Sequence, residues 1–126
     1  MKPKFIRLVI CVAIIIFTTN ARGDQSPFAL QKYPLDELRI WYVVPRGAYT
    51  FAYVLDKDGY IYHVEKSEYI GNRHGEVSKI DSCGIWLVEL VQGPTGDWKE
   101  SRAFLGVNDI EARKTCLNKR KQWLGQ

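Results

Sequence analysis

The chain has 126 residues, a formal net charge of +4 and three cysteines. This length suits one domain of ordinary size and leaves no room for a second. Four of the 18 basic residues, and none of the 14 acidic ones, precede Asp24. The remainder is therefore neutral, which removes the main argument for nucleic-acid binding. Within it, residues 108–126 hold five basic and two acidic groups, so an acidic body carries a basic tail.

The first 23 residues have the composition of a secretory signal peptide. A basic start is followed by an apolar run over residues 8–17 and then by small residues. This order predicts cleavage before Asp24 and export to the periplasm. The residues that carry it are Lys2, Lys4 and Arg7 at the start, and Ala21 and Gly23 at the cleavage site.

Two alternatives to cleavage stay open. The apolar run is about half of the roughly 20 residues that a membrane-spanning helix needs, which disfavours a retained anchor without excluding it. Lipid attachment at Cys11 is disfavoured because Ile10 is not small and because the apolar stretch follows the cysteine. We therefore expect a periplasmic protein that could also associate with the inner membrane.

The segment before the domain differs in composition from the segments that follow it. Residues 24–33 are polar, contain Pro27 and show no periodicity, which predicts a short extended lead. Pro34 then opens a short helical turn, since proline suits a first helical position and the acidic residues after it favour an N-terminus.

From Arg39 onward the sequence predicts strands. Runs of β-branched and aromatic residues alternate with glycine-bearing turns, which is typical of hairpins. The expected strands cover residues 39–44, 48–55, 60–64, 76–81, 85–91 and 98–105. No connection is long enough for a crossover helix, so the topology is antiparallel. We expect a mainly β fold, a small sandwich of two packed sheets with about six short strands, over residues 34–107.

The second of these strands alternates large and small side chains. Tyr49, Phe51 and Tyr53 share one face, and small residues line the other. This pattern predicts a strand packed on both faces, with the aromatic side chains in the core.

The tail, residues 108–126, is expected to be helical. Asn108 followed by Glu111 forms a capping-box pattern, which predicts a helix from Asp109 to about Lys121. Its basic cluster could contact acidic lipid head groups or an acidic protein surface, or could simply be a solvated helix end. The cluster consists of Arg113, Lys114, Lys119, Arg120 and Lys121.

Two cysteines, Cys83 and Cys116, remain after the signal. A disulfide between them is one alternative in an oxidising compartment, and two isolated thiols are the other. The sequence cannot decide between them, because it does not give the distance between the two Cα atoms.

The search for catalytic chemistry finds no specific constellation. His63 and His74 could be combined with an acid into a metal site, but their spacing matches no closed zinc pattern. We expect no catalytic residue, no metal and no cofactor, and keep a periplasmic metal-dependent enzyme only as a remote alternative. A β domain without catalytic residues can still bind a partner through an unpaired strand at the edge of a sheet. The first strand is the candidate edge, with Arg39, Trp41 and Tyr42 as the candidate contact residues.

Several segments resemble, in order and spacing, the PilP family of type IV pilus assembly proteins. The resemblance runs from about Pro27 to Leu105, and its most specific piece is Tyr-Ile-Gly-Asn-x-x-Gly-Glu-Val at residues 69–77, beside the opening Pro34-Leu35-Asp36. The other matching segments are residues 52–54, 58–64, 85–90 and 96–101.

The resemblance implies a small β-sandwich related to the homology region of the type II secretion inner-membrane component. It also implies an adaptor that links the inner-membrane proteins PilN and PilO to the secretin PilQ. The residues that match the motif are interpreted as turn glycines, a helix start and core residues, including a core tryptophan at Trp98. They are Pro34, Leu35, Leu38, Gly59, Gly71, Gly75 and Trp98.

Two features depart from the family pattern. Family members carry a lipidated N-terminal cysteine and a long arm that engages the inner-membrane proteins, whereas only residues 24–33 precede the domain here. The resemblance therefore supports the secretin contact more directly than the PilN and PilO contact. A related β domain of a type II secretion or DNA-uptake system is the alternative function.

Overall fold

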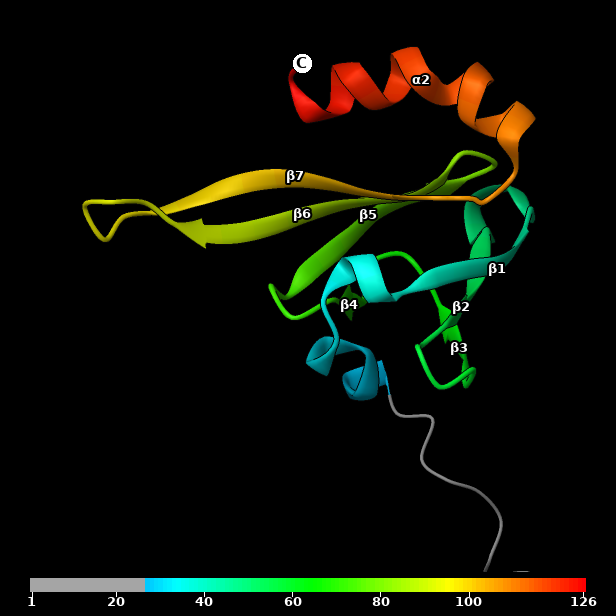
Figure 1. The fold of residues 1–126 in the computed structure, drawn as a ribbon, viewed down its shortest axis with the longest axis horizontal. Coiled ribbons are helices and arrows are strands. Elements are labelled where there is room, and N and C mark those ends of the chain that lie inside the picture. Colours follow the sequence, from blue (N-terminus) through cyan, green and yellow to red (C-terminus); the bar gives the residue numbers. More distant parts are fainter. Residues whose placement is uncertain (1–26) are drawn as a thin grey trace, which may run out of the picture.

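The computed structural model describes residues 27–126. The predicted signal peptide, its cleavage site and Cys11 lie outside these residues. Within residues 27–126, seven strands form two antiparallel sheets, and a long helix follows them (Figure 1). The first sheet has the order β1-β2-β3, with bounds Arg39–Val44, Phe51–Leu55 and Ile61–Val64. The second has the order β4-β5-β6-β7, with bounds Tyr69–Ile70, Gly75–Asp81, Gly84–Gln92 and Trp98–Gly106.

The expected sandwich of two antiparallel sheets is confirmed, with one strand more than expected. The additional strand is β4, a two-residue strand in which Tyr69 lies opposite Glu76 and Ile70 opposite Gly75. A pair this short leaves hardly any alternating pattern in the sequence, which is why the prediction missed it.

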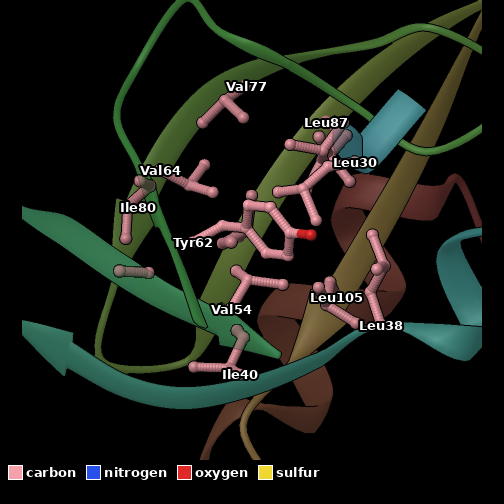
Figure 2. Packing of buried hydrophobic residues seen from close by; sticks show 13 residues of the cluster. Leu30, Leu38, Ile40, Val54, Tyr62, Val64, Val77, Ile80, Leu87 and Leu105 are labelled. Atoms are coloured by element: carbon pink, nitrogen blue, oxygen red, sulfur yellow. The ribbon is translucent and has the colours of Figure 1, made fainter. Parts of the chain in front are cut away.

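The space between the sheets holds the main hydrophobic core (Figure 2). Val54 and Val64 from one sheet and Ile85 and Leu87 from the other are completely buried. Strands β2 and β3 contribute every second residue, as expected for sheets with one face on the core.

The lead before the domain is not extended as predicted. Residues Pro27–Lys32 form a 3-10 helix, η1, whose Leu30 is 1% exposed and joins the core. The backbone N–H of Gly71 donates to the carbonyl of Leu30, which fixes η1 against the start of the β4–β5 turn. The prediction failed because it relied on polarity and overlooked the apolar residues of the segment: Leu30 lies in the core, and Ala29 and Tyr33 pack against it.

The β2–β3 hairpin turn is built around a buried acid. Asp56 is 1% exposed and accepts hydrogen bonds from the backbone N–H groups of Asp58 and Tyr60 and from the hydroxyl of Tyr62. Although burial raises the pKa of Asp56, these hydrogen bonds outweigh it and lower the pKa below its ordinary value. Burial, together with the neighbouring Asp56, raises the pKa of Tyr62 to about 12. Gly59 takes the left-handed conformation that ends the turn, with φ +86°.

The C-terminal helix, α2, spans Ile110–Leu124 and lies across the outer face of β6 and β7 (Figure 1). Its N-cap is Asp109, whose carboxylate accepts from the N–H of Glu111, and not Asn108 as the capping-box pattern indicated. Since either residue can cap a helix, the sequence alone did not fix the first turn.

A disulfide joins Cys83 to Cys116 and fastens α2 to the sheet, with 5.7 Å between the Cα atoms. Around it, Trp86 packs against Phe104 and Trp123, with ring centroids 4.3 and 5.7 Å away. The helix is therefore docked by one covalent bond and a small aromatic cluster.

One hairpin extends beyond the sandwich. Strand β5 pairs with β6 only as far as Val88, so Glu89–Gln92 and Trp98–Ser101 pair with each other alone. We call these two segments and their connecting turn the β6–β7 arm, which projects from the rest of the molecule in Figure 1. None of the helices within residues 27–126 has the length and hydropathy that a bilayer crossing requires.

Candidate functional site

The first strand is an edge of its sheet, as predicted. Strand β1 pairs with β2 on one side only, and the pairing is interrupted between Ile40 and Tyr42 by a bulge at Trp41. A bulge adds one residue to a strand and breaks the alternation of its side chains. Trp41 and Tyr42 are therefore both exposed, at 60% and 59%, although they are consecutive.

A groove runs beside this edge. It has a volume of about 360 Å³ and lies between β1 and the segment that enters α2. Trp41, Tyr42 and Pro45 line one side, while Val107 and Ala112 line the other. An aromatic, mostly apolar groove next to an unpaired strand edge can receive an extended chain.

Arg39 lies in a different place from the other two candidate contact residues. It lines a second cleft of about 520 Å³, between η2 (Leu35–Glu37), the end of β7 and α2. Two further arginines, Arg113 and Arg120, line the same cleft. The structure thus brings Trp41 and Tyr42 together and separates Arg39 from them.

The aromatic residues of β2 lie outside the core, contrary to the prediction. Phe51 and Tyr53 are half-buried on the outer face of the first sheet, where Tyr53 contacts Trp41 with ring centroids 5.9 Å apart. Tyr49 is 82% exposed and belongs to a 3-10 turn, η3 (Gly47–Tyr49), instead of the strand. The small residue Ala52 faces the core and is completely buried.

The two histidines have separate surroundings. His63 on β3 packs against Phe51 with ring centroids 4.3 Å apart, and its Nε2 lies 3.7 Å from the carboxylate of Glu65. His74 adopts a positive φ of 52° before β5 and shares a 3.0 Å hydrogen bond with Gln31. Within residues 27–126 no three His, Cys, Asp or Glu side chains gather as a metal site would require.

Most of the residues interpreted as structural lie in such positions. Pro34 precedes η2, Leu35 packs against the core, and Leu38 is 2% exposed. Gly71 has a φ of +82°, which favours glycine. A Cβ at Gly75 would lie 3.2 Å from the carbonyl oxygen of Ile70, so the backbones approach closely there.

Trp98 is the exception, because it is 67% exposed and not a core tryptophan. It lies at the far end of the arm, opposite Gln92. The buried tryptophan is Trp86, which is 1% exposed on the outer face of β6. The sequence signal that could have identified it is the unbroken apolar run from Ile85 to Leu87. All three of these residues are buried in the structure.

A family model now places this fold among known proteins. The model described as "Pilus assembly protein, PilP" matches residues 19–107, which is more than half of the chain. The chain belongs to the PilP family. The description of this family is that of an assembly protein, not of an enzyme, and the family supports a role in type IV pilus biogenesis. The match ends before α2, so the helix and its cysteine, Cys116, lie outside it.

Solved PilP structures share the fold. The solution structure of PilP from Pseudomonas aeruginosa is 23% identical, with a TM-score of 0.56, over 71% of this chain and 78% of that chain. A domain of the type IV pilus biogenesis lipoprotein PilP from the same organism is 24% identical, with a TM-score of 0.55, over 69% and 95%. A domain of the Neisseria meningitidis PilP pilot protein is 26% identical, with a TM-score of 0.53, over 73% and 78%. No curated protein sequence matches the chain.

Proposed function

We propose that the protein is a periplasmic adaptor of the type IV pilus assembly machinery, exported by its N-terminal signal peptide. In this role it links the inner-membrane proteins PilN and PilO to the secretin PilQ by protein–protein contacts. Membership of the PilP family supports the pilus assembly role. The observation that supports a binding function most directly is the unpaired edge of β1, with two exposed aromatic residues beside an apolar groove.

The β1 edge suits a partner that adds an extended segment. Its unpaired backbone groups would supply hydrogen bonds, and Trp41 and Tyr42 would supply apolar contact area. Aromatic residues of this kind frequently account for most of the binding free energy of an interface. The first turn of α2 closes the other side of the groove, which limits the width of the segment that can enter.

The test is a binding measurement with the purified N-terminal periplasmic domains of the secretin. Trp41→Ala and Tyr42→Ala should each weaken binding by about tenfold or more, the effect of losing a central aromatic contact. Tyr49→Ala is the matched control, because Tyr49 is equally aromatic and more exposed but does not line the groove. The absence of binding by the unmodified protein at high micromolar concentration would refute the secretin contact.

The inner-membrane contact needs its own measurement. Co-purification of the full chain with PilN and PilO from membranes would support that half of the link. Failure of this contact alone would leave a secretin-binding protein and would reduce the proposal to one partner.

A further inference from the structure

The structure divides the basic cluster of the tail into two groups. Arg113 and Arg120 line the second cleft, whereas Lys114, Lys119 and Lys121 are exposed and do not line it. The two arginines are seven residues apart on α2, which is about two helical turns, so they lie on one face of the helix. The cleft therefore receives the arginines and leaves the lysines to solvent.

Two attachments hold this face of α2 against the sheet. Between the two arginines, Cys116 forms the disulfide with Cys83 in the turn before β6. Beyond Arg120, the indole of Trp123 donates a 2.9 Å hydrogen bond to the carbonyl of Ala103 on β7. Because the helix is fixed at two points, it cannot rotate about its axis, and the arginines keep their place beside the cleft.

The charge of the cleft is positive. Arg39 at the start of β1 also lines it, and so does one acid, Asp36 of η2. Three arginines against one aspartate leave an excess of two positive charges. Within residues 27–126 none of these four side chains forms an ion pair. Arg113 donates to the carbonyl of Val107 and to the side-chain oxygen of Asn108, which uses two of the five donors of its guanidinium group.

Apolar side chains share the cleft with the arginines. Leu105 is buried, Phe104 is half-buried and Leu117 is 45% exposed, and all three line the cleft. The guanidinium carbon of Arg120 lies 6.0 Å from the centroid of the Phe104 ring. An occupant that fits the cleft therefore needs acidic groups for the arginines and apolar atoms for the surface between them.

We propose that this cleft binds an acidic segment of a partner protein through the carboxylates of its aspartate or glutamate side chains. A guanidinium group is a planar fork that pairs with a carboxylate through two parallel hydrogen bonds. Apolar side chains of the same segment contact the leucines and the phenylalanine. A bilayer of acidic lipids attracts arginine and lysine alike, whereas the lysines of the cluster lie outside the cleft.

The cleft is a second contact surface, beyond the proposed function. It meets the groove beside β1 at Val107 and Asn108, which line both, but its arginines do not line that groove. The proposal therefore does not rest on the secretin contact through β1.

The experiment is a nuclear magnetic resonance titration of the purified, isotope-labelled protein with the capped pentapeptide Gly-Glu-Leu-Glu-Gly. We expect saturable shifts of the amides around the cleft, including Arg39, Gly106 and Leu117, and weaker binding as the salt concentration is raised. The peptide Gly-Gln-Leu-Gln-Gly has the same shape without the charges and should not bind.

Matched variants locate the interaction. The double variant Arg113→Gln, Arg120→Gln should weaken the acidic peptide by about tenfold or more, as expected when charge-assisted hydrogen bonds are lost. The double variant Lys119→Gln, Lys121→Gln removes the same charge from the same helix outside the cleft, so the affinity should change by less than about twofold. Asp36→Asn should tighten binding, because it removes the acid that competes for the arginines. Well-dispersed spectra of each variant would establish that the fold is retained.

Four results would overturn the proposal. Equal binding of the neutral peptide would show that charge is not recognised, and equal losses in the two double variants would show attraction to the helix as a whole. Binding to vesicles of phosphatidylethanolamine and phosphatidylglycerol, without binding of the peptide, would assign the cleft to lipid. Shifts of the cleft amides that grow with protein concentration alone would assign it to a second copy of this chain. Secretin binding and its Trp41 and Tyr42 variants are measured separately, so the failure of either proposal is distinguished from the failure of the other.

Discussion

The two faces of the four-stranded sheet are covered in different ways. The inner face packs against the first sheet through a core of thirteen buried residues, drawn from η1, from Leu38 and from all seven strands. The outer face is covered by one helix, through the disulfide and three aromatic side chains, Trp86, Phe104 and Trp123. The family match includes the whole inner face and stops before α2. The inner face thus lies within the family match, whereas the helix that covers the outer face lies outside it and is held by few contacts.

The hydrophobic clusters on the two faces also differ in one polar group each. On the inner side, the hydroxyl of Tyr62 donates to Asp56, so the one hydroxyl within the core has a partner. On the outer side, the indole Nε1 of Trp86 is buried with no hydrogen-bond partner among the described residues. An unpaired buried donor reduces stability. The outer cluster is therefore less complete, and the disulfide compensates by linking the helix covalently.

The largest expected effect comes from a cavity on the inner face. Leu87→Ala removes a completely buried side chain and should lower the free energy of unfolding by roughly 3 to 5 kcal/mol. Leu90→Ala is the control on the same strand, because Leu90 is 58% exposed, and its cost should stay within about 0.5 kcal/mol. Denaturant unfolding measures both. Similar losses for the two variants would show that the inner face is not the main source of stability.

Removal of the disulfide tests the outer cover. The double variant Cys83→Ser, Cys116→Ser removes a cross-link between two residues that are 33 positions apart in the sequence. It should lower the free energy of unfolding by roughly 2 to 4 kcal/mol. The sandwich should remain folded, because its core does not depend on α2. Hydrogen exchange should show lost protection in Ile110–Leu124 and retained protection in the strands. Collapse of the strand signals as well would mean that the helix is part of the shared core.

The sequence predicted the inner face better than the outer one. Alternation and glycine turns located six of the seven strands, since a strand with one face on the core repeats every second residue. From the alternation in β2 we predicted a strand packed on both faces, with the large side chains in the core, whereas only the face with the small side chains is fully buried. Which face is buried depends on contacts between strands that are distant in the sequence, and in the structure it is the face that carries Ala52 and Val54.

The candidate site was predictable only in part. The position of β1 at an edge and the exposure of Trp41 and Tyr42 agree with the sequence argument. The bulge that exposes both side chains could not be inferred, because it depends on register with β2. Neither the groove beside β1 nor the second cleft, which Arg39 lines, could be predicted, since each combines segments from distant parts of the chain. The docking of α2 was also hidden, because its apolar residues form no continuous stripe.

An intermediate loss of stability is expected from substitution of Asp56, the buried acid that accepts a hydrogen bond from the hydroxyl of Tyr62. Asp56→Asn should lower the free energy of unfolding at neutral pH by about 2 kcal/mol, since charge-assisted hydrogen bonds in the turn are lost. The lowered pKa of Asp56 means that the unfolded chain takes up the proton first as the pH falls. Its stabilising effect is therefore present above the ordinary pKa of 3.8 and is lost as the pH falls through the lowered native value.

The difference in stability between the unmodified protein and Asp56→Asn should accordingly narrow in acid. Glu68 has a pKa raised by burial and by the nearby Glu65, which acts in the opposite direction. Both proteins contain it, so it cancels from the difference. Unfolding curves at a series of pH values below about 5 measure the narrowing. A constant difference would show that the charge of Asp56 is not what stabilises the turn.

The smallest effect is expected at the outer aromatic cluster. The indole of Trp123 donates a 2.9 Å hydrogen bond to the carbonyl of Ala103, and the guanidinium of Arg102 lies 4.7 Å from its ring centroid. Trp123→Phe keeps an aromatic ring but loses the donor, so it should cost about 1 kcal/mol. Because the disulfide still holds the helix, the loss should be confined to faster hydrogen exchange in α2. Trp98→Phe, at an exposed tryptophan of the arm, is the control and should change nothing measurable. If Trp123→Phe accelerated exchange equally in β2 and β5, the two faces of the sheet would be energetically coupled, and the helix would stabilise the whole domain.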